Sequence, residues 1–308
     1  MPLPFRHSAA ALALVLAFSA APSAPAAAQQ VPDTVRVRVI PVAGGVSMLV
    51  GRGGNIALSA GDDGAFIVDD QYAPMSDRIR AAVASVTPRP VRFVLNTHWH
   101  GDHTGGNESF GKAGAVIVAH DNVRRRLSTD QFVASINDTI RASPRAALPV
   151  VTFADAVTLH LNGDEVHAFH VPPAHTDGDA IVHFRRANVV HMGDTFLNGN
   201  YPYVDLGSGG DYEGLIAAVD RVLAMVNDST RIIPGHGALS NRAELREWRG
   251  MLVTVRDRIA ARIAAGETLE QVKAARPTAD LDPRWGGGFV NGERLVETVY
   301  RSLAHGRR

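Results

Sequence analysis

Three histidines and an aspartate stand close together in the segment Thr97-His98-Trp99-His100-Gly101-Asp102-His103, directly after an apolar run that ends at Leu95-Asn96. Imidazoles and carboxylates are the ligands that zinc takes when no thiolate is present, and a catalytic zinc keeps one position open for water. The chain has no cysteine, so histidines and carboxylates must supply any metal ligands. A loop of hydrogen-bonded surface histidines is the alternative, but it does not account for this spacing.

Three further fragments place a ligand-type residue just behind an apolar, strand-like segment. They are Ala174-His175-Thr176, Gly193-Asp194-Thr195 and Pro234-Gly235-His236-Gly237. Loops that follow strands are common positions for functional side chains, because a rigid sheet holds them in place. Each fragment alone is compatible with an ordinary loop residue. Their order behind the first motif favours a single site that all four segments share.

The four segments in this order resemble the metallo-β-lactamase superfamily, and the likeness extends from Asp69 to at least His236. The resemblance implies an α/β fold, a four-layer αβ/βα sandwich of two mixed β-sheets with the metal site at one edge. It also implies two Zn²⁺ ions per chain and a buried carboxylate, Asp69, that supports the ligands. The implied ligands are His98, His100 and His175 for one zinc, Asp102, His103 and His236 for the other, and Asp194 as the bridge.

Two cations a few ångströms apart lower the pKa of a shared water from ~15.7 toward ~7 and polarise a substrate carbonyl. We therefore expect a metal-dependent hydrolase that attacks an amide, lactone or thioester carbonyl with a metal-activated hydroxide. The zinc held by three histidines would take the oxyanion, and the other zinc would hold the leaving group. Asp102 is also a candidate catalytic residue, because it would orient the nucleophile.

A segment rich in Asn, Tyr and Gly follows Asp194 and is the candidate substrate loop. Asn200 and Tyr201 are the candidate catalytic donors in it, with Tyr203 beside them. A hydrogen bond to a developing oxyanion can be worth ~2.7–4 kcal/mol in the transition state. The alternative is that both tyrosines simply pack in the interior.

The substrate class stays open at this point. Some β-lactam hydrolases of the family have a cysteine at the position of Asp194 and a nearby lysine for the drug's carboxylate. This chain has neither, and no Lys or Arg stands between Phe196 and Arg221. Asp194 resembles the thioester- and lactone-hydrolysing branches, whereas His175-Thr-Asp-Gly-Asp179 resembles secreted, β-lactamase-like members.

Two other functions compete with hydrolysis. The same fold hosts iron-dependent oxidoreductases, although their di-iron members usually have Glu where this chain has His100. A metal-binding protein without catalysis would need a closed coordination shell, whereas the implied ligand set leaves positions open for water. Six further histidines are expected to be core or surface residues. Two of them, His170 and His191, lie close enough in the sequence to ligands to donate hydrogen bonds to them. The others are His120, His160, His167 and His183.

Apolar runs of four to eight residues alternate with longer amphipathic segments, which predicts a β-α-β alternation within one domain. Strands are expected at 35–42, 46–50, 55–58, 65–68, 91–95, 115–119, 157–161, 165–170, 180–184, 188–191 and 231–234. Helices are expected at 76–86, capped by Ser76, at 122–127 and 213–226, and over most of the tail (242–265, 269–275 and 293–303).

Residues 1–28 have the features of a secretory signal peptide, with Arg6 before an apolar run and an Ala-rich cleavage region near Ala28. Residues 29–308 would then be one metallo-β-lactamase-like catalytic domain, periplasmic or secreted, with no membrane attachment after cleavage. The chain has 31 basic residues (Lys and Arg) and 31 acidic residues (Asp and Glu), so its formal net charge is zero. It therefore has no excess of positive charge that would favour nucleic acid as a partner. The expected partner is a small-molecule substrate, and the sequence carries no signal for an oligomeric state.

Overall fold

The structure is a computed structural model that describes Met1 and residues 34–133 and 137–305. Contacts divide the chain into two units, Met1–Gln30 and Val31–Arg308, and all the helices and strands described below belong to the second. The predicted leader, residues 1–28, lies outside the described residues apart from Met1. Its cleavage therefore stays a prediction.

The first sheet is mixed and has seven strands. Its first four strands run antiparallel as a meander, and the last three join in parallel through helical connections. In spatial order the strands are β1 (Arg38–Ala43), β2 (Val46–Val50), β3 (Ile56–Gly61), β4 (Gly64–Val68), β5 (Val91–Leu95), β6 (Val116–His120) and β9 (Val151–Phe153).

The second sheet has six strands and is also mixed, because β13 and β14 pair in parallel while the other neighbours are antiparallel. A separate hairpin is formed by β7 (Gln131–Val133) and β8 (Asp138–Ile140). The strands of the second sheet are β10 (Ala156–Leu161), β11 (Asp164–His170), β12 (Ala180–Phe184), β13 (Val189–His191), β14 (Arg231–Ile233) and β15 (Ser240–Asn241).

Side chains that alternate along the strands fill three apolar layers. In β4, Phe66 points into the core between the sheets while Ile67 packs on the outer side of the first sheet. In β12, Val182 points into the same central core while Ile181 packs on the outer side of the second sheet. Both sheets are therefore apolar on both faces, and each needs helices to cover its outer face.

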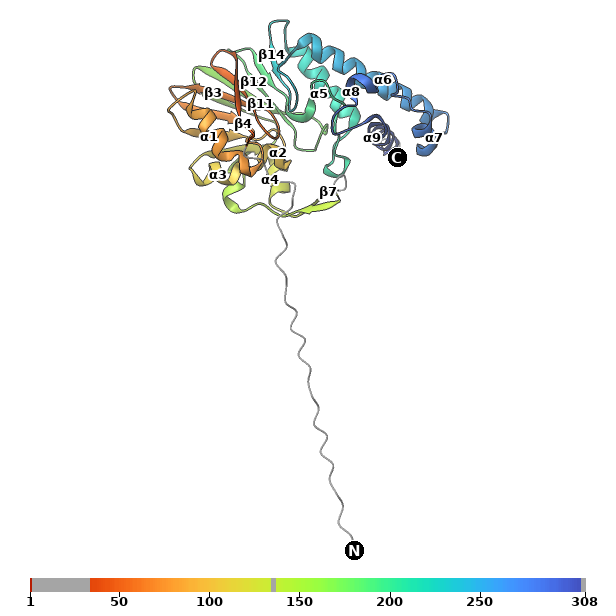
Figure 1. The fold of residues 1–308 in the computed structure, drawn as a ribbon, viewed down its shortest axis with the longest axis horizontal. Helices are drawn as coiled ribbons and strands as arrows, with labels where there is room; N and C mark the ends of the chain where they lie inside the picture. Colours follow the sequence, from red (N-terminus) through yellow and green to blue (C-terminus); the bar gives the residue numbers. More distant parts are fainter. Residues whose placement is uncertain (2–33, 134–136, 306–308) are drawn as a thin grey trace. The chain divides into compact units, whose positions relative to one another are not determined.

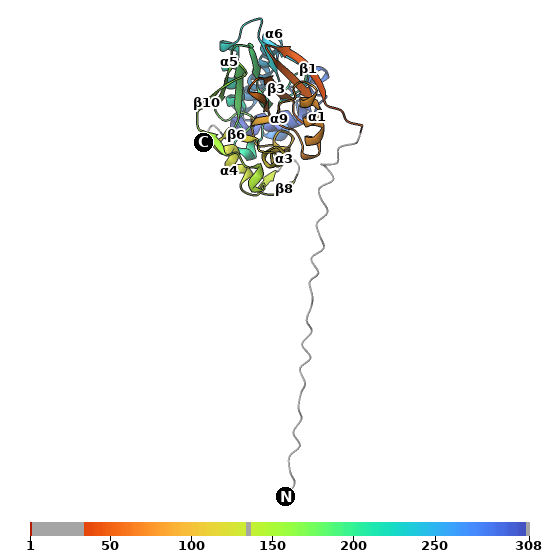
Figure 2. The ribbon, with the colours of Figure 1, turned by 90° about the vertical axis from the view of Figure 1, so that its left-hand side faces the viewer.

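Helices cover the two outer faces, which completes an αβ/βα sandwich. Side chains of α1 and α3 pack on the first sheet, and those of α5, α6 and α9 pack on the second. Figure 2 shows α1 and α5 on opposite sides of the strands, and Figure 1 shows α6 to α9 in blue beyond α5. The α-helices are α1 (Ser76–Ala84), α2 (Gly101–Thr104), α3 (Asn107–Lys112), α4 (Asp121–Leu127), α5 (Tyr212–Met225), α6 (Arg242–Ala264), α7 (Leu269–Ala274), α8 (Asp282–Trp285) and α9 (Gly292–His305). Short 3-10 turns are η2 (Ala73–Met75), η3 (Arg145–Ala147), η4 (Gly193–Thr195) and η5 (Leu206–Ser208).

The predicted sandwich of two mixed sheets is confirmed, and the predicted strands and long helices lie within a few residues of their expected bounds. The predicted cap at Ser76 is wrong. Turn η2 runs straight into α1, so Ser76 is already helical and its hydroxyl donates to the Ala73 carbonyl. The elements that sequence periodicity did not predict are all short: β7, β8, β9, β15, α2, α3 and α8.

No helix in the described ranges combines the length and the apolar character needed to cross a lipid bilayer.

The central core depends on an edge-to-face pair of buried rings, Phe66 and Phe184, whose centroids lie 6.1 Å apart. We predict that Phe184→Ala lowers the free energy of unfolding by about 3–5 kcal/mol, because the cavity between the sheets cannot collapse. Phe132→Ala is the control, since that ring is 64% exposed, and it should cost about 0.5 kcal/mol or less. Urea unfolding followed by circular dichroism measures both, and equal losses would contradict this account of the core.

Candidate metal centre

The loop after β5 carries four of the seven predicted ligands on a short stretch of chain. His98 is buried at the start of the loop, and His100 immediately precedes α2, the single turn that carries Asp102 and His103. The loop is fixed at its base by two hydrogen bonds between the side-chain amides of Asn96 and Asn107. The turn of α2 places the Asp102 and His103 side chains on the same side as His98.

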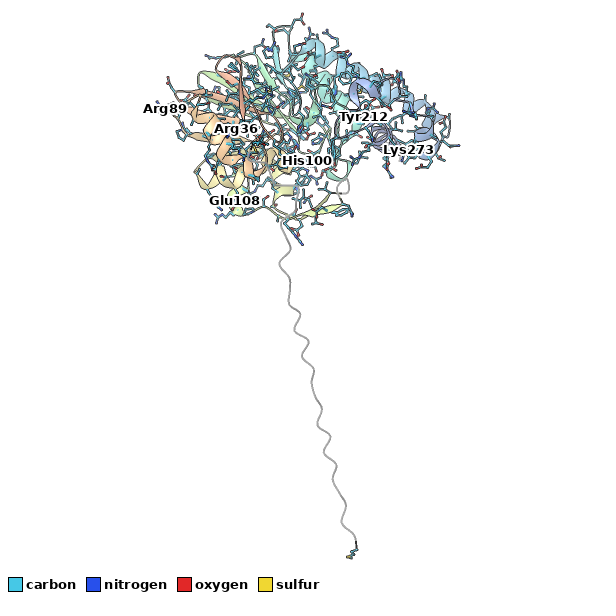
Figure 3. The ribbon with its side chains drawn as sticks, in the orientation of Figure 1. Arg36, Arg89, His100, Glu108, Tyr212 and Lys273 are labelled. Atoms are coloured by element: carbon cyan, nitrogen blue, oxygen red, sulfur yellow. The ribbon has the colours of Figure 1, made fainter. Side chains whose placement is uncertain are left out.

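The other three predicted ligands follow strands of the second sheet. His175 lies in the loop after β11, Asp194 lies in turn η4 after β13, and His236 lies just after β14. Because β13 and β14 are parallel neighbours, the chain segments that follow them leave the same edge of the sheet. Figure 3 labels His100 where these loops meet the first sheet's loop.

The structure brings all seven predicted ligands together. Three overlapping groups of ligand atoms form, and in each group the atoms lie within 4.8 Å of one another. The groups are His98, His100 and His175; His98, His103 and Asp194; and Asp102, His103 and His236. We call these seven side chains the metal cluster. The first and third groups match the two sets of ligands that the family resemblance implies.

Asp194 lies between the two groups. Its Oδ1 is 3.1 Å from His103 Nε2 and 3.5 Å from His236 Nε2, and its Oδ2 is 3.7 Å from His175 Nε2. One carboxylate oxygen thus faces each group, as a bridging ligand requires. Asp102 completes the third group, with Oδ2 3.2 Å from His236 Nε2 and 3.6 Å from His103 Nε2.

A buried carboxylate, Asp69, fixes two of the imidazoles from outside the cluster. Its Oδ2 lies 2.8 Å from His103 Nδ1, and it also accepts a hydrogen bond from the hydroxyl of Thr97. Because that hydroxyl donates to Asp69, it can only accept from His98 Nδ1, which is 3.0 Å away. Both rings therefore carry a proton on Nδ1, and each Nε2 faces the cluster as the nitrogen that would bind a metal ion.

The loop after η4 fixes the other two imidazoles in the same way. His175 Nδ1 donates to the Tyr203 carbonyl at 2.7 Å, which leaves His175 Nε2 unprotonated. His100 Nε2 lies 3.0 Å from Asp205 Oδ2, so His100 presents Nδ1 to the cluster, 2.9 Å from His175 Nε2. Four rings thus turn inward the nitrogen that would bind a metal ion once that nitrogen carries no proton.

The cluster fits a metal by two further observations. His98 Nε2 is fully buried and has no hydrogen-bond partner in the described parts of the chain, a costly arrangement unless the atom binds an ion. Two glycines make room for ligands: a Cβ at Gly54 would overlap the His103 ring, and one at Gly235 would overlap Asp194 Oδ1. Both loops are shaped around the side chains that they admit.

The two halves of the cluster differ in charge. Burial and the neighbouring imidazoles lower the pKa of His98 well below its usual range, and burial lowers the pKa of His175 to about 4. Burial also opposes the charge of His236, but Asp194 and Asp102 outweigh it and raise the pKa of that ring to about 10. The pKa of Asp102 falls to about 2, because His103 and His236 outweigh the effect of its burial.

The structure does not bring Tyr201 to the cluster. Its ring is buried in the core beneath α6 and its hydroxyl donates to Asp282 at 2.9 Å, so it packs instead of serving as an oxyanion donor. Asn200 likewise contacts its own loop, where its side-chain amide donates to the Asn198 carbonyl. The ring of Tyr203 is the one that reaches the cluster, 5.9 Å from the His100 ring centroid.

Sequence reasoning missed two residues near the cluster. The side chain of Asp205 contacts the His100 ring. Burial opposes the negative charge of Asp205, but its hydrogen bonds with His100 and Ser208 lower its pKa to about 2. A metal-bound imidazole usually has such a partner, so an aspartate in the loop after Asp194 was a usable signal. Tyr72 lies near Asp102, in the other half of the cluster, and burial and the Asp102 carboxylate raise the pKa of its hydroxyl.

Three further histidines, His120, His170 and His191, make contacts outside the cluster. His191 is buried, with Nε2 2.9 Å from the Asn55 carbonyl, and it accepts from the Gly193 amide just before Asp194. His170 stacks on His120 at 3.8 Å and bonds the Asp179 carbonyl. In the described residues, no group of metal-ligand atoms includes either His170 or His191.

The sandwich carries a candidate metal site, the cluster, at its edge. The chain belongs to the metallo-β-lactamase superfamily, whose sequence model matches residues 49–236. The match begins in β2 and ends at the last residue of the cluster, His236.

Individual proteins are similar to this chain in sequence or in fold. The chain is 28% identical to a hydroxyacylglutathione hydrolase of Nitrosococcus oceani over 169 residues, 54% of this chain and only 57% of that protein. It is 27% identical to another hydroxyacylglutathione hydrolase, from Anaeromyxobacter dehalogenans, over 81% of this chain and 82% of that one. The fold is similar to a solved metallo-beta-lactamase from Pontibacter korlensis, with a TM-score of 0.57, 17% identity and coverage of 71% of this chain and 99% of that one.

Metal binding to the half that contains His103 and His236 should release protons, because both rings have raised pKa values and a ligand must be unprotonated. We predict a release of about one to two protons per chain near pH 7, and an affinity that rises between about pH 6 and pH 8. Calorimetric titration in two buffers of different ionisation enthalpy measures the release. Binding heats that do not depend on the buffer would contradict this picture of the cluster.

Proposed function

We propose that this chain is an exported hydrolase that binds two zinc ions through the metal cluster and hydrolyses a carboxylic acid derivative, foremost a thioester. The observation that carries the proposal is the set of inward ring nitrogens of four imidazoles, His98, His100, His103 and His175, gathered around Asp194. Zinc fits a donor set of nitrogen and oxygen in a chain without thiolates.

The ions would supply a water of lowered pKa and a Lewis acid for the substrate carbonyl. The protein's part is positional. Of the residues in the third group, Asp102 and His236 are the more open, with side chains 22% and 34% exposed, whereas His103 is fully buried. Substrate therefore approaches over Asp102 and His236, and the Asp102 carboxylate is placed to accept a hydrogen bond from the attacking water and orient it.

A thioester fits this site better than an amide. A thiol of the cysteine type has a pKa near ~8.5, so a thiolate leaves without a proton donor, whereas an amine does not. The two oxyanion donors expected from the sequence, Asn200 and Tyr201, are bound elsewhere in the fold, which favours the more reactive carbonyl of a thioester. The names of the relatives agree, since a hydroxyacyl group on glutathione is a thioester.

A substrate panel tests the proposal directly. Protein loaded with zinc is given chromogenic thioester, lactone, β-lactam and phosphodiester substrates, before and after removal of metal with a chelator. We expect thioester hydrolysis that the chelator abolishes and added zinc restores. Phosphodiester cleavage alone, or activity with tightly bound iron in place of zinc, would overturn the proposal and favour another chemistry on the same fold.

Export rests on the charged start, apolar run and Ala-rich region of residues 1–28. When the full chain is expressed in a bacterium with a periplasm, the mature protein should begin near Gln29 and appear in the periplasmic fraction. Amino-terminal sequencing measures this. An intact chain that stays in the cytoplasmic fraction would refute export and leave the hydrolase assignment untouched.

We predict that His98→Ala and Asp102→Asn each lower kcat/KM for the best substrate by about 100-fold or more, since even the outer partners of metal ligands are typically worth 10–100-fold. His160→Ala is the matched control, because His160 is an exposed histidine on β10 outside the cluster. Circular dichroism should show the same fold in all three variants. Wild-type turnover in either cluster variant would remove that residue from the site.

A further inference from the structure

An aromatic pair lies beside the three-histidine group. The Tyr203 ring stacks near the His100 ring, with centroids 5.9 Å apart and planes 29° apart, and its edge meets the His175 ring at 5.6 Å. The Tyr203 carbonyl also holds His175 in place. The ring of Phe289 then contacts Tyr203 edge to face, with centroids 5.4 Å apart.

Phe289 is an exposed ring in a fixed position. Its side chain is 59% exposed, on the loop that joins α8 to α9. The guanidinium of Arg294 lies 4.7 Å from the Phe289 ring centroid and donates to the Phe289 carbonyl. The start of the same loop is tied to the substrate loop by the hydrogen bond from the Tyr201 amide to the Trp285 carbonyl at 2.8 Å.

These contacts leave an apolar surface next to a catalytic centre. Exposing an aromatic ring to water is unfavourable, and burying it against a ligand recovers that free energy. Phe289 also lies outside residues 49–236, the part of the chain that matches the superfamily, in the helical segment seen in blue in Figure 1. A feature outside the shared core is well placed to determine substrate choice and not the reaction itself.

From this geometry we infer that Phe289 and Tyr203 form an acyl subsite, which binds an aromatic acyl group while the substrate carbonyl lies over the metal cluster. The inference rests on the proposed hydrolase function and adds the substrate class to it. A planar ring can pack edge to face or offset against both side chains, whereas an acetyl group has no ring to pack. Both residues act on specificity, and neither takes part in bond breaking.

The test compares two thioesters of one small thiol, phenylacetyl and acetyl, with thiol release followed by a chromogenic reagent. Phe289→Ala should lower kcat/KM for the phenylacetyl thioester by about tenfold, from the loss of one aromatic contact and its buried area. The acetyl thioester should change by less than about twofold, because its acyl group has no ring to pack against Phe289. Phe289→Tyr keeps the ring and should restore the preference.

Met225→Ala is the matched control, because Met225 is an exposed apolar residue at the far end of α5. The amino end of α5 adjoins the His175 loop through the hydrogen bond from Asp211 to Ala174. A helix of 14 residues is about 20 Å long, so Met225 is distant from the cluster. Neither thioester should respond to this change.

A binding measurement separates the inference from the proposed function. Fluorine NMR of 4-fluorophenylacetate should show line broadening with wild-type protein and with Met225→Ala, and clearly weaker broadening with Phe289→Ala. Broadening that depends on Phe289 without any hydrolysis would support the subsite and refute the hydrolase. An acyl preference and a fluorine signal that are both unchanged in folded Phe289→Ala would overturn the subsite, as would the absence of both activity and binding in wild-type protein.

Discussion

The ability of the cluster to bind a metal depends on which ring nitrogen of each histidine carries a proton. Asp69 is buried without a cation of the Lys or Arg type among its hydrogen-bond partners in the described residues, and it accepts from Thr97 and lies 2.8 Å from the His103 ring. Through Thr97 the same carboxylate determines the tautomer of His98. Without these outer contacts an imidazole could rotate or turn an N–H inward, and the donor set would be lost. The backbone at Asp69 has φ of 65°, a left-handed conformation that costs free energy and is held by these bonds.

The sandwich serves this arrangement by bringing distant segments to one edge. The first sheet supplies Asp69 and the loop from His98 to His103, and the second supplies His175, Asp194 and His236. Apolar side chains from both sheets pack together in the central core. This packing fixes the position of the ligands from the first sheet relative to those from the second. A metal ion bound between them would tie the same sheets together a second time, which couples metal binding to stability.

Sequence reasoning found the candidate ligands because they stand beside strands whose apolar runs are easy to recognise, and the family resemblance then assigned them to two groups. The motif from His98 to His103 carries most of its information within six residues, and His236 follows a strand directly. What it missed depends on contacts between segments far apart in the chain. Asp205 pairs with His100 across 105 residues, and Tyr201 turns away because Asp282, 81 residues later, accepts its hydroxyl. No local pattern in a single sequence reports such pairings.

Sequence periodicity did not predict the short elements, for a different reason. Turns of four to six residues, such as α2 and α3, are too short for a helical period to appear, and their positions follow from tertiary contacts such as Asn96 with Asn107. The exposed ring of Phe289 gives no signal in the sequence, since its significance lies in its contact with Tyr203. Local sequence patterns thus predict the scaffold and the candidate ligands. The residues that surround the ligands, such as Asp205 and Phe289, can be recognised only in the folded structure.

Anomalous diffraction at the zinc absorption edge, from crystals grown with zinc, is the most direct test of the central claim. The account predicts two peaks about 3.5–4 Å apart, as in known two-metal sites. One should lie among Nε2 of His98, Nδ1 of His100 and Nε2 of His175, and Asp194 should lie between the two. A single peak elsewhere, or rings turned so that His100 presents Nε2 and His98 presents Nδ1, would contradict it.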